Sequence, residues 1–272
     1  MKRDKLGDRM KTNYEEVYKF KLTRRTPVII RLDGKAFHTF TRGLEKPFDR
    51  IFMKSMQETM KYLCENIQGC VLGYTQSDEI TLVLVDYKKL DSSAWFDYEV
   101  QKLSSVSASM ATLAFNKCFE YNVESFKEEM KDLTIEIDQK YLDTLDKCVG
   151  NGAMFDSRCF NIPREEVTNC LLWRQQDATR NSIQMLAQQY FSQKEIEHKS
   201  NNELQDMLFT QKGINWNDLP TDQKRGSCCI KEKTQFLTIE NYSRWIIDRD
   251  IPIFKNSGRN YIENLIKEEI NY

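Results

Sequence analysis

The sequence predicts an α+β fold: an antiparallel sheet of the split βαβ type with helices on one face, followed by a mostly helical C-terminal part. Two observations support this fold. Short apolar runs alternate with longer segments whose apolar residues recur at helical spacing, and their order is strand, helix, strand, strand, helix, strand. With 272 residues, 40% of them hydrophobic, the chain is long enough to bury a substantial core.

The first half of the split βαβ pattern lies between residues 28 and 85. The apolar run 28–32 predicts a buried strand, and the turn at 34–40 opens a short helix. A helix is predicted over 47–67, where Pro47 and Asp49 are start signals and apolar residues repeat at helical spacing. Two further strands, 70–77 and 80–85, then flank a tight hairpin at Ser77-Asp-Glu79.

The second half of the pattern begins with a helix over residues 93–116, whose small residues at 104–112 favour close packing on a sheet. A strand at 153–162 and a helix from Pro163 to about residue 189 complete the order. Between them, residues 120–152 are rich in charge and end in Gly150-Asn-Gly152, so this stretch is interpreted as a surface insertion or sub-domain boundary.

The chain is expected to divide near residue 190. Residues 1–190, including the charged insertion at 120–152, form the first region, and residues 191–272 form a polar, mostly helical second region. An apolar, strand-like stretch at 244–254 lies near the end of that second region.

Composition narrows the class of protein. The net charge of −1 does not indicate a nucleic-acid binder, although clustered Lys and Arg could still contact a phosphate backbone. Eight cysteines without a Cys-x-x-Cys pair and only two histidines argue against zinc. No apolar run reaches the roughly 18 residues that span a bilayer, and residues 1–10 have no signal-peptide core. We therefore expect a cytoplasmic or other intracellular protein without membrane association, with an organellar location left open.

Three acidic residues are the candidate catalytic group. Asp33 ends the first strand, and Asp78 and Glu79 occupy the hairpin. Two carboxylates about 4 Å apart repel by roughly 4 kcal/mol at an effective dielectric near 20, and a divalent cation removes that penalty. Oxygen ligands without His or Cys favour Mg²⁺. Because successive strand residues face opposite ways, Asp78 and Glu79 can both bind a metal only if the turn rotates one of them.

The alternative interpretation of these acids is structural. Asp78-Glu79 can be a solvated hairpin tip, and Asp33 a turn former before Gly34. The chain has neither a P-loop nor a Rossmann glycine fingerprint, so nucleotide binding has no support from those motifs. Cationic residues that could meet phosphate oxygens are Lys35, Lys46, Lys102 and Arg158.

Five sequence blocks follow one another along the chain: Arg31-Leu-Asp-Gly-Lys-Ala-Phe-His38, Lys46-Pro-Phe-Asp49, Gly73-Tyr-Thr-Gln-Ser-Asp-Glu79, Phe155-Asp-Ser-Arg158 and Trp173-Arg-Gln-Gln-Asp177. In this order they resemble the tRNA-histidine guanylyltransferase family, and the similarity runs from about residue 4 to 230. The resemblance implies a catalytic domain like the polymerase palm that adds nucleotides to the 5′ end of RNA, in the 3′-to-5′ direction.

The resemblance also implies roles for individual residues. Asp33, Asp78 and the Gly34 carbonyl would hold two Mg²⁺ ions, with Glu79 supporting the catalytic site. Nucleotide phosphates would be contacted by the loop Gly34, Lys35, Ala36, Phe37 and His38, and by Lys46, Ser77 and Lys102. The substrates would be tRNA, ATP, and GTP or another nucleoside triphosphate.

One block departs from the family pattern. Enzymes dedicated to histidine tRNA carry His-x-Asn-Asn-Leu-Tyr-Asn after the Trp-Arg-Gln run, whereas this chain has Thr179-Arg-Asn-Ser-Ile-Gln-Met185. It therefore resembles the Thg1-like branch, which prefers template-dependent repair of truncated tRNA 5′ ends. Asn181 remains from that stretch and is expected in the nucleotide pocket.

The expected reaction begins when ATP activates a 5′-phosphorylated tRNA, after which a nucleoside triphosphate is added by a two-metal mechanism. Alternatives are guanylate addition to histidine tRNA as the main role, a nucleotidyl-cyclase-like palm enzyme, and a non-catalytic RNA-binding protein. The resemblance suggests a homotetramer. Candidate RNA contacts, in part within the C-terminal region, are Arg158, Arg174, Lys199, Lys224 and Arg225.

Overall fold

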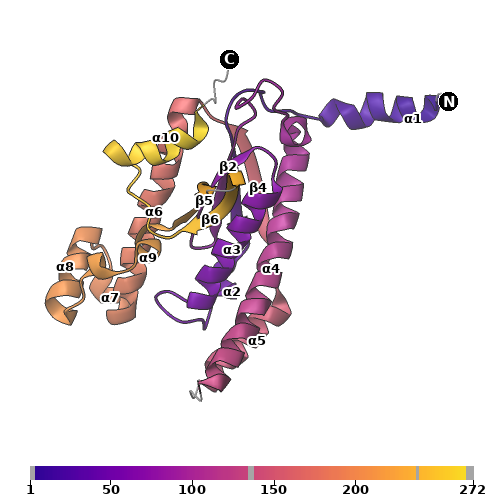
Figure 1. Ribbon diagram of the computed structural model, residues 1–272. Helices are drawn as coiled ribbons and strands as arrows, with labels where there is room; N and C mark the ends of the chain where they lie inside the picture. The colour runs from indigo at the N-terminus through magenta and orange to yellow at the C-terminus, as the bar shows by residue number, and fades with distance from the viewer. Residues whose placement is uncertain (1–3, 134–137, 237–238, 268–272) are drawn as a thin grey trace.

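A six-stranded antiparallel sheet is the centre of the computed structural model, which describes residues 4–133, 138–236 and 239–267 (Figure 1). The strand order is β4-β1-β3-β2-β5-β6. The first four strands have the order expected of a split βαβ unit, which confirms the predicted fold class. The strand bounds are β1 (Val28–Gly34), β2 (Cys70–Gln76), β3 (Glu79–Leu84), β4 (Phe155–Asn161), β5 (Ser227–Phe236) and β6 (Ile239–Asp248).

Long helices connect the strands at the positions that the periodicity indicates. The two crossover helices are α3 and α4, and α3 starts where Asp49 caps it by accepting a hydrogen bond from the Phe52 amide at 2.8 Å. The helix bounds are α1 (Lys5–Met10), α2 (Phe37–Phe40), α3 (Arg50–Asn66), α4 (Val100–Asp132), α5 (Gln139–Asn151), α6 (Arg164–Tyr190), α7 (Gln193–Ile196), α8 (Asn201–Lys212), α9 (Thr221–Arg225) and α10 (Asn260–Ile266).

Helices cover both faces of the sheet, although the sequence pattern predicted them on one face only. Alternate residues of β1 show why: Ile30 packs into a core with α3, α4 and α5, whereas Ile29 packs into a second core with α6 and α10. Strand side chains alternate between faces, so a strand that is apolar on both sides requires a cover on both. At the end of β1 the second face becomes polar, with Arg31 and Asp33.

The charged stretch at 120–152 forms two helices rather than a surface insertion. The helix predicted to end at 116 continues as α4 to Asp132, and α5 begins at Gln139; residues 134–137 lie outside the described residues. Leu145 and Cys148 of α5 are buried in the first core. The segment has charged residues on its solvent side, and its apolar residues at helical spacing pack against α4 and α2.

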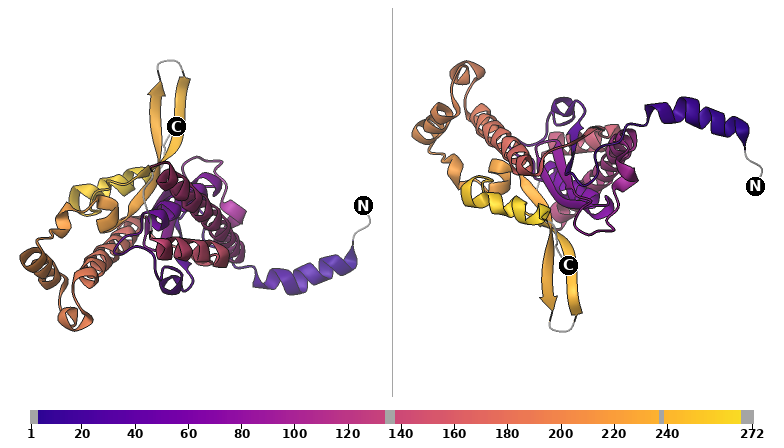
Figure 2. Two further views of the ribbon diagram at one scale, coloured as in Figure 1. Left: turned by 90° about the horizontal axis from the view of Figure 1, so that it is seen from below. Right: turned by 90° about the horizontal axis from the view of Figure 1, so that it is seen from above.

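The C-terminal region contributes strands to the same sheet. Residues Ser227–Ile230 of β5 pair with β2, and β6 pairs with β5. The strand-like stretch predicted at 244–254 corresponds to β6, which lies earlier, and β5 was not predicted because its sequence is largely polar. Figure 2 shows the far part of this hairpin projecting away from the rest of the molecule. The division near residue 190 stays a prediction.

The N-terminal helix α1 also projects from the body of the molecule (Figures 1 and 2). Neither α1 nor the two short helical turns after it, through Tyr18, contain a buried residue. No helix in the described ranges combines the length and the apolar character needed to cross a membrane.

Candidate active site

The hairpin between β2 and β3 brings the predicted acids together. Asp33 lies opposite Glu79 in the β1–β3 pairing, and the Gly34 amide donates to the Asp78 carbonyl at 3.1 Å. Ser77 has a φ of 49°, so the two-residue turn holds Asp78 at the end of the sheet beside the end of β1. The expected convergence of Asp33 with the hairpin is therefore present in the fold.

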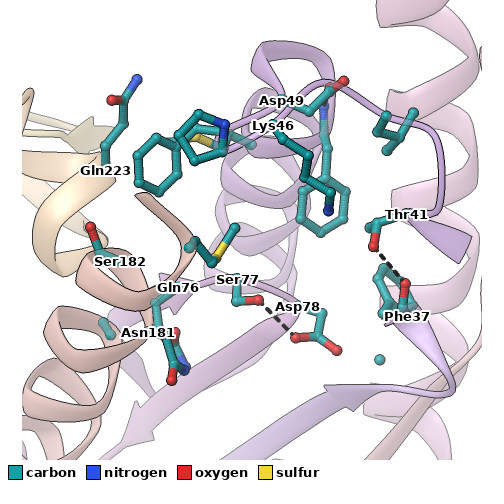
Figure 3. A pocket seen from close by; sticks show the side chains of 18 of the residues that line it. Phe37, Thr41, Lys46, Asp49, Gln76, Ser77, Asp78, Asn181, Ser182 and Gln223 are labelled. Carbon is teal, nitrogen blue, oxygen red and sulfur yellow. Dashed lines mark hydrogen bonds between the residues drawn. The ribbon is translucent and has the colours of Figure 1, made fainter. Parts of the chain in front are cut away.

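Asp78 carries a carboxylate in an unfavourable electrostatic environment. Burial raises its pKa above the usual value, and the neighbouring Asp33 charge raises it further, against hydrogen bonds from its own backbone and from Ser77. The Ser77 hydroxyl lies 3.0 Å from the carboxylate (Figure 3). Since no cationic side chain is among the groups that shift this pKa, the position favours binding of an added cation.

Glu79 is in a different situation from its neighbour. Its buried carboxylate accepts a hydrogen bond from Arg174 Nε at 2.7 Å, and Arg174 Nη2 donates to Asp177 at 2.7 Å. Burial raises the pKa of Glu79, while the Arg174 charge opposes that shift. Its carboxylate is thus committed to an ion pair with α6, and Glu79 is not among the residues that line the pocket described below.

The turn after β1 requires glycine at position 34. A Cβ atom there would lie 2.2 Å from the Phe37 ring, which packs against Phe52, Phe115 and Phe155. The Phe37 side chain is therefore part of the core, and only its backbone is free to contact a nucleotide. The amides of Gly34 and Lys35 already donate to the carbonyls of Asp78 and Met154, so these two N–H groups are paired within the fold.

A pocket of about 530 Å³ opens beside the hairpin, large enough for a small-molecule ligand (Figure 3). Its walls are α2 and the loop after it, the start of α3, the β2–β3 turn, and parts of α6 and α9. Lys46 extends into it from the wall across from Ser77 and Asp78. The predicted residues that line it are Gly34, Ala36, Phe37, His38, Lys46, Ser77, Asp78 and Asn181.

Two predicted phosphate contacts lie outside this pocket. Lys35 is exposed and is not among the lining residues. Lys102 is near the start of α4, whereas Thr112, ten residues later, receives the hydrogen bond from the Phe155 amide at the site end of β4. Lys102 instead pairs with Glu99 at 3.6 Å. Helix α4 runs antiparallel to β4, so its first turn lies far from the Asp33 end of the sheet.

The loop that carries Lys46 is held by residues that the sequence reasoning missed. Asp49 accepts hydrogen bonds from the Glu45 amide at 3.1 Å and from the Tyr141 hydroxyl at 2.8 Å, besides capping α3. Tyr141 belongs to α5, and burial raises its pKa. The segment 120–152 therefore braces the pocket loop. The start signal at Asp49 was visible in the sequence, but its partner 92 residues away was not.

The predicted RNA contacts are scattered over the surface, with one exception. Arg158 is exposed on the edge strand β4 and pairs with Asp156 at 2.9 Å; Lys199 pairs with Glu203 at 3.7 Å; Lys224 donates to the Asn217 carbonyl at 2.6 Å. Arg225 ends α9. Arg174 is the exception. It was predicted to contact RNA, but its side chain is buried in the ion pair with Glu79, so its charge is not available to RNA.

The acids suit one class of metal. The described residues contain no group of three or more His, Cys, Asp or Glu side chains that could hold an ion. Two carboxylates, Asp33 and Asp78, and the adjacent Gly34 carbonyl are present instead. Magnesium is usually held by one or two carboxylates together with water and substrate phosphates. The residues therefore fit Mg²⁺ that arrives with a nucleotide.

Comparison with known proteins identifies the family. The model of the family described as "Thg1: tRNAHis guanylyltransferase" matches residues 7–163. This chain belongs to that family. A bacterial Thg1-like protein in complex with ATP superimposes with a TM-score of 0.78 and 44% identity, covering 96% of this chain and 99% of that one. A bacterial Thg1-like protein in complex with GTP superimposes with a TM-score of 0.76 and 40% identity, covering 96% of this chain and 99% of that one.

Curated relatives agree with the family. The tRNA(His) guanylyltransferase of Saccharomyces cerevisiae is 28% identical over 219 residues, which is 75% of this chain and 82% of the yeast protein. The matched family region includes the Asp33 strand and the Asp78 hairpin, and the superimposed bacterial structures extend over the C-terminal strands as well. The nucleotidyltransferase fold is therefore shared along the chain.

Proposed function

We propose that this protein adds nucleotides to the 5′ end of tRNA in the 3′-to-5′ direction, repairing truncated ends by copying the opposite strand. The observation that carries the proposal is the convergence of Asp33 with the hairpin residue Asp78, which lines a pocket of nucleotide size. The similar bacterial proteins in complex with ATP and with GTP support a nucleoside triphosphate as the occupant.

Asp33, Asp78 and the Gly34 carbonyl would hold the two Mg²⁺ ions, which supply Lewis-acid stabilisation of phosphate charge and a more acidic attacking hydroxyl. The chain's own residues bind and orient the reactants. Lys46 extends into the pocket as the cation for the triphosphate, and the backbone from Ala36 to His38 lines the same wall. Asn181 of α6 lines the far wall of the pocket and would contact the nucleotide from there.

The proposed reaction consists of two successive substitutions at phosphorus. A phosphate oxygen of the tRNA 5′-monophosphate attacks the α-phosphorus of ATP, forming a phosphoanhydride and releasing pyrophosphate. The 3′-hydroxyl of the incoming nucleoside triphosphate then attacks the 5′-phosphorus of the tRNA, and AMP leaves. The hydroxyl proton passes to solvent or to a nearby base. Both transfers develop negative charge on phosphate oxygens, which Lys46 would stabilise.

Repair is favoured over obligatory guanylate addition to histidine tRNA by the sequence of α6. The stretch Thr179–Met185 lacks the aromatic and paired-Asn pattern of dedicated enzymes, and in this protein it contributes Asn181, Ser182 and Met185 to the pocket wall. Base pairing with the 3′ strand would then select the nucleotide.

The deciding experiment is extension of a 5′-monophosphorylated tRNA lacking its first nucleotide, with ATP, Mg²⁺ and each triphosphate in turn. We expect incorporation of the nucleotide that pairs with the template strand, and a full-length histidine tRNA as a poor substrate. Labelled cyclic nucleotide formed from GTP without RNA would support the cyclase alternative. Absence of any incorporation by wild type would contradict the proposal.

Two variants distinguish the proposed enzyme from a non-catalytic RNA-binding protein. Asp33→Ala and Asp78→Ala should retain tRNA affinity within a few fold, because neither residue carries positive charge, while losing extension.

We also propose a homotetramer as the active assembly. Analytical ultracentrifugation at the assay concentration would test it, and a monomer that is fully active would contradict it.

A further inference from the structure

Trp173 on α6 is a large aromatic side chain left half-exposed beside the catalytic acids. Its exposed fraction is 49%, whereas Trp95 and Trp216 are 8% and 9% exposed. Tryptophan is usually well buried in a folded chain. Aromatic rings left open next to cationic groups are typical of surfaces that stack on nucleobases.

Two arginines hold the Trp173 ring. The Arg174 guanidinium lies 4.3 Å from the ring centroid and the Arg31 guanidinium 5.7 Å from it. Arg174 is itself fixed by its buried ion pair with Glu79. The ring is therefore attached to a rigid support, and a rigid aromatic surface loses little conformational entropy when it binds a ligand.

The place of the ring in the fold is set by β1. Arg31 is two residues before Asp33, so both side chains point to the same face of the sheet, about 7 Å apart along the strand. Trp173 thus lies one side-chain position from the catalytic acid, on the face that α6 covers. The buried Nε of Arg31 has no hydrogen-bond acceptor among the described residues, which leaves an unpaired donor beneath the surface next to the Trp173 ring.

The edge strand β4 extends this surface. Arg158 lies opposite Arg31, and Asp156 lies opposite Asp33. Phe160, two residues beyond Arg158 on the same face, is 36% exposed. Since β4 is the first strand in the sheet order, nothing in the described chain continues the sheet beyond it. On this face the open edge therefore presents Phe160, Arg158 and then Asp156, which pairs with Arg158 at 2.9 Å and lies opposite Asp33.

We propose that the Trp173 indole stacks on the nucleobase at the 5′ end of the RNA and so positions the terminal phosphate at Asp33 and Asp78. Trp173 is then a positioning residue, with Arg31 and Arg158 facing the adjacent backbone phosphates. The inference rests on the proposed function and deepens it. The pocket with Lys46 takes the triphosphate, and the RNA end approaches along the Trp173 surface.

The test uses RNA with and without the base that would stack. Extension and binding are measured for a 5′-truncated tRNA and for the same RNA with an abasic 5′-terminal nucleotide. The proteins are wild type, Trp173→Ala, Trp173→Phe and Tyr121→Ala, the last a control because Tyr121 is 65% exposed on α4 and is not among the residues that line the pocket.

Alanine substitution of a stacking aromatic removes the base contact, so Trp173→Ala should raise the KM for normal RNA on the order of tenfold. The KM for ATP should stay within twofold. With the abasic RNA, the KM of wild type should rise to that of Trp173→Ala, and the KM of Trp173→Ala should not rise further. Trp173→Phe should retain most of the base dependence, and Tyr121→Ala should match wild type.

Fluorescence gives a readout that does not depend on turnover. Normal RNA should quench wild-type emission more than abasic RNA does, and that difference should disappear in Trp173→Phe. If removal of the base raises the KM of wild type and of Trp173→Ala by the same factor, the inference is wrong. It is also wrong if Trp173→Ala changes the assembly size but keeps the full dependence of KM on the base. If wild type shows base-dependent quenching but extends nothing, the stacking stands and the proposed function fails.

Discussion

Asp78 and Glu79 are neighbours in the chain with opposite environments. Asp78 lies in the hairpin turn facing the pocket, where its carboxylate meets the Ser77 hydroxyl and the charge of Asp33. Glu79 begins β3, points to the face covered by α6, and is neutralised by Arg174. The comparison shows that the element packed on each side decides whether an acid is available to a ligand or serves the fold.

The strongest test of this difference compares Asp78→Asn with Glu79→Gln in nucleotide extension. Loss of a metal ligand removes several kcal/mol of charge stabilisation, so Asp78→Asn should lower kcat about a thousandfold or more. Glu79→Gln keeps an oxygen for Arg174 and should lower kcat about tenfold. Equal losses in single-turnover assays would show that Glu79 also reaches the reacting phosphates.

Arg174 tests the structural side of the comparison. Arg174→Met leaves the Glu79 carboxylate buried without its partner, so the free energy of unfolding should fall by about 3–5 kcal/mol. Urea denaturation measures this. Arg180→Met is the matched control, because Arg180 pairs with Asp177 at 2.9 Å on the exposed side of α6, and its loss should cost less than about 1 kcal/mol.

A double variant separates charge from packing. Adding Glu79→Gln to Arg174→Met removes the uncompensated charge and should recover part of the lost stability. If the double variant is no more stable than Arg174→Met alone, the loss comes from packing around the arginine rather than from the unpaired carboxylate.

Magnesium should stabilise the protein through Asp78. At 100 times its dissociation constant, a ligand that binds only the folded state adds about 2.7 kcal/mol, so adding Mg²⁺ should raise the melting temperature of wild type above its value with ATP alone, but should not do so for Asp78→Asn. A similar rise in both proteins would indicate that the ion binds elsewhere.

The pH dependence without metal has a definite sign. The folded protein raises the pKa of Asp78, so stability from this group is complete below the ordinary value of 3.8 and falls as pH rises through the raised value. Asp78→Asn should therefore be more stable than wild type at neutral pH in chelator. The two unfolding curves should converge as the pH approaches 3.8, and a constant difference at all pH values would contradict the assigned cause.

The smallest expected effect is on the KM for ATP, through Lys46 in the pocket. Lys46→Ala removes a cation that extends into the pocket and should raise the KM for ATP about tenfold, in line with a hydrogen bond between charged groups. Lys102→Ala is the control, because Lys102 pairs with Glu99 outside the pocket and its removal should leave that KM within twofold. Steady-state kinetics with ATP varied measures both.

The local sequence was sufficient for much of the fold. The apolar run at the start of β1, the helical spacing of α3 and the short polar turn at Ser77-Asp78 each reflect physics that acts within a few residues, namely burial, periodicity and turn geometry. Their order then predicted the strand pairing that puts Asp33 beside the hairpin, and the structure confirms it. In contrast, β5 was missed because its polar sequence becomes a strand only by pairing with β2.

By itself, then, the sequence determined the elements, their order and which acids end the strands, because each depends on neighbouring residues. Only the tertiary structure decided that Arg174 is buried on Glu79, that Lys102 lies at the wrong end of α4, and that Tyr141 holds the loop of Lys46 through Asp49. The Arg174–Glu79 and Tyr141–Asp49 contacts join residues 95 and 92 positions apart, and the place of Lys102 follows from how α4 packs along β4. Such pairs depend on how helices pack on the sheet, which no local pattern encodes.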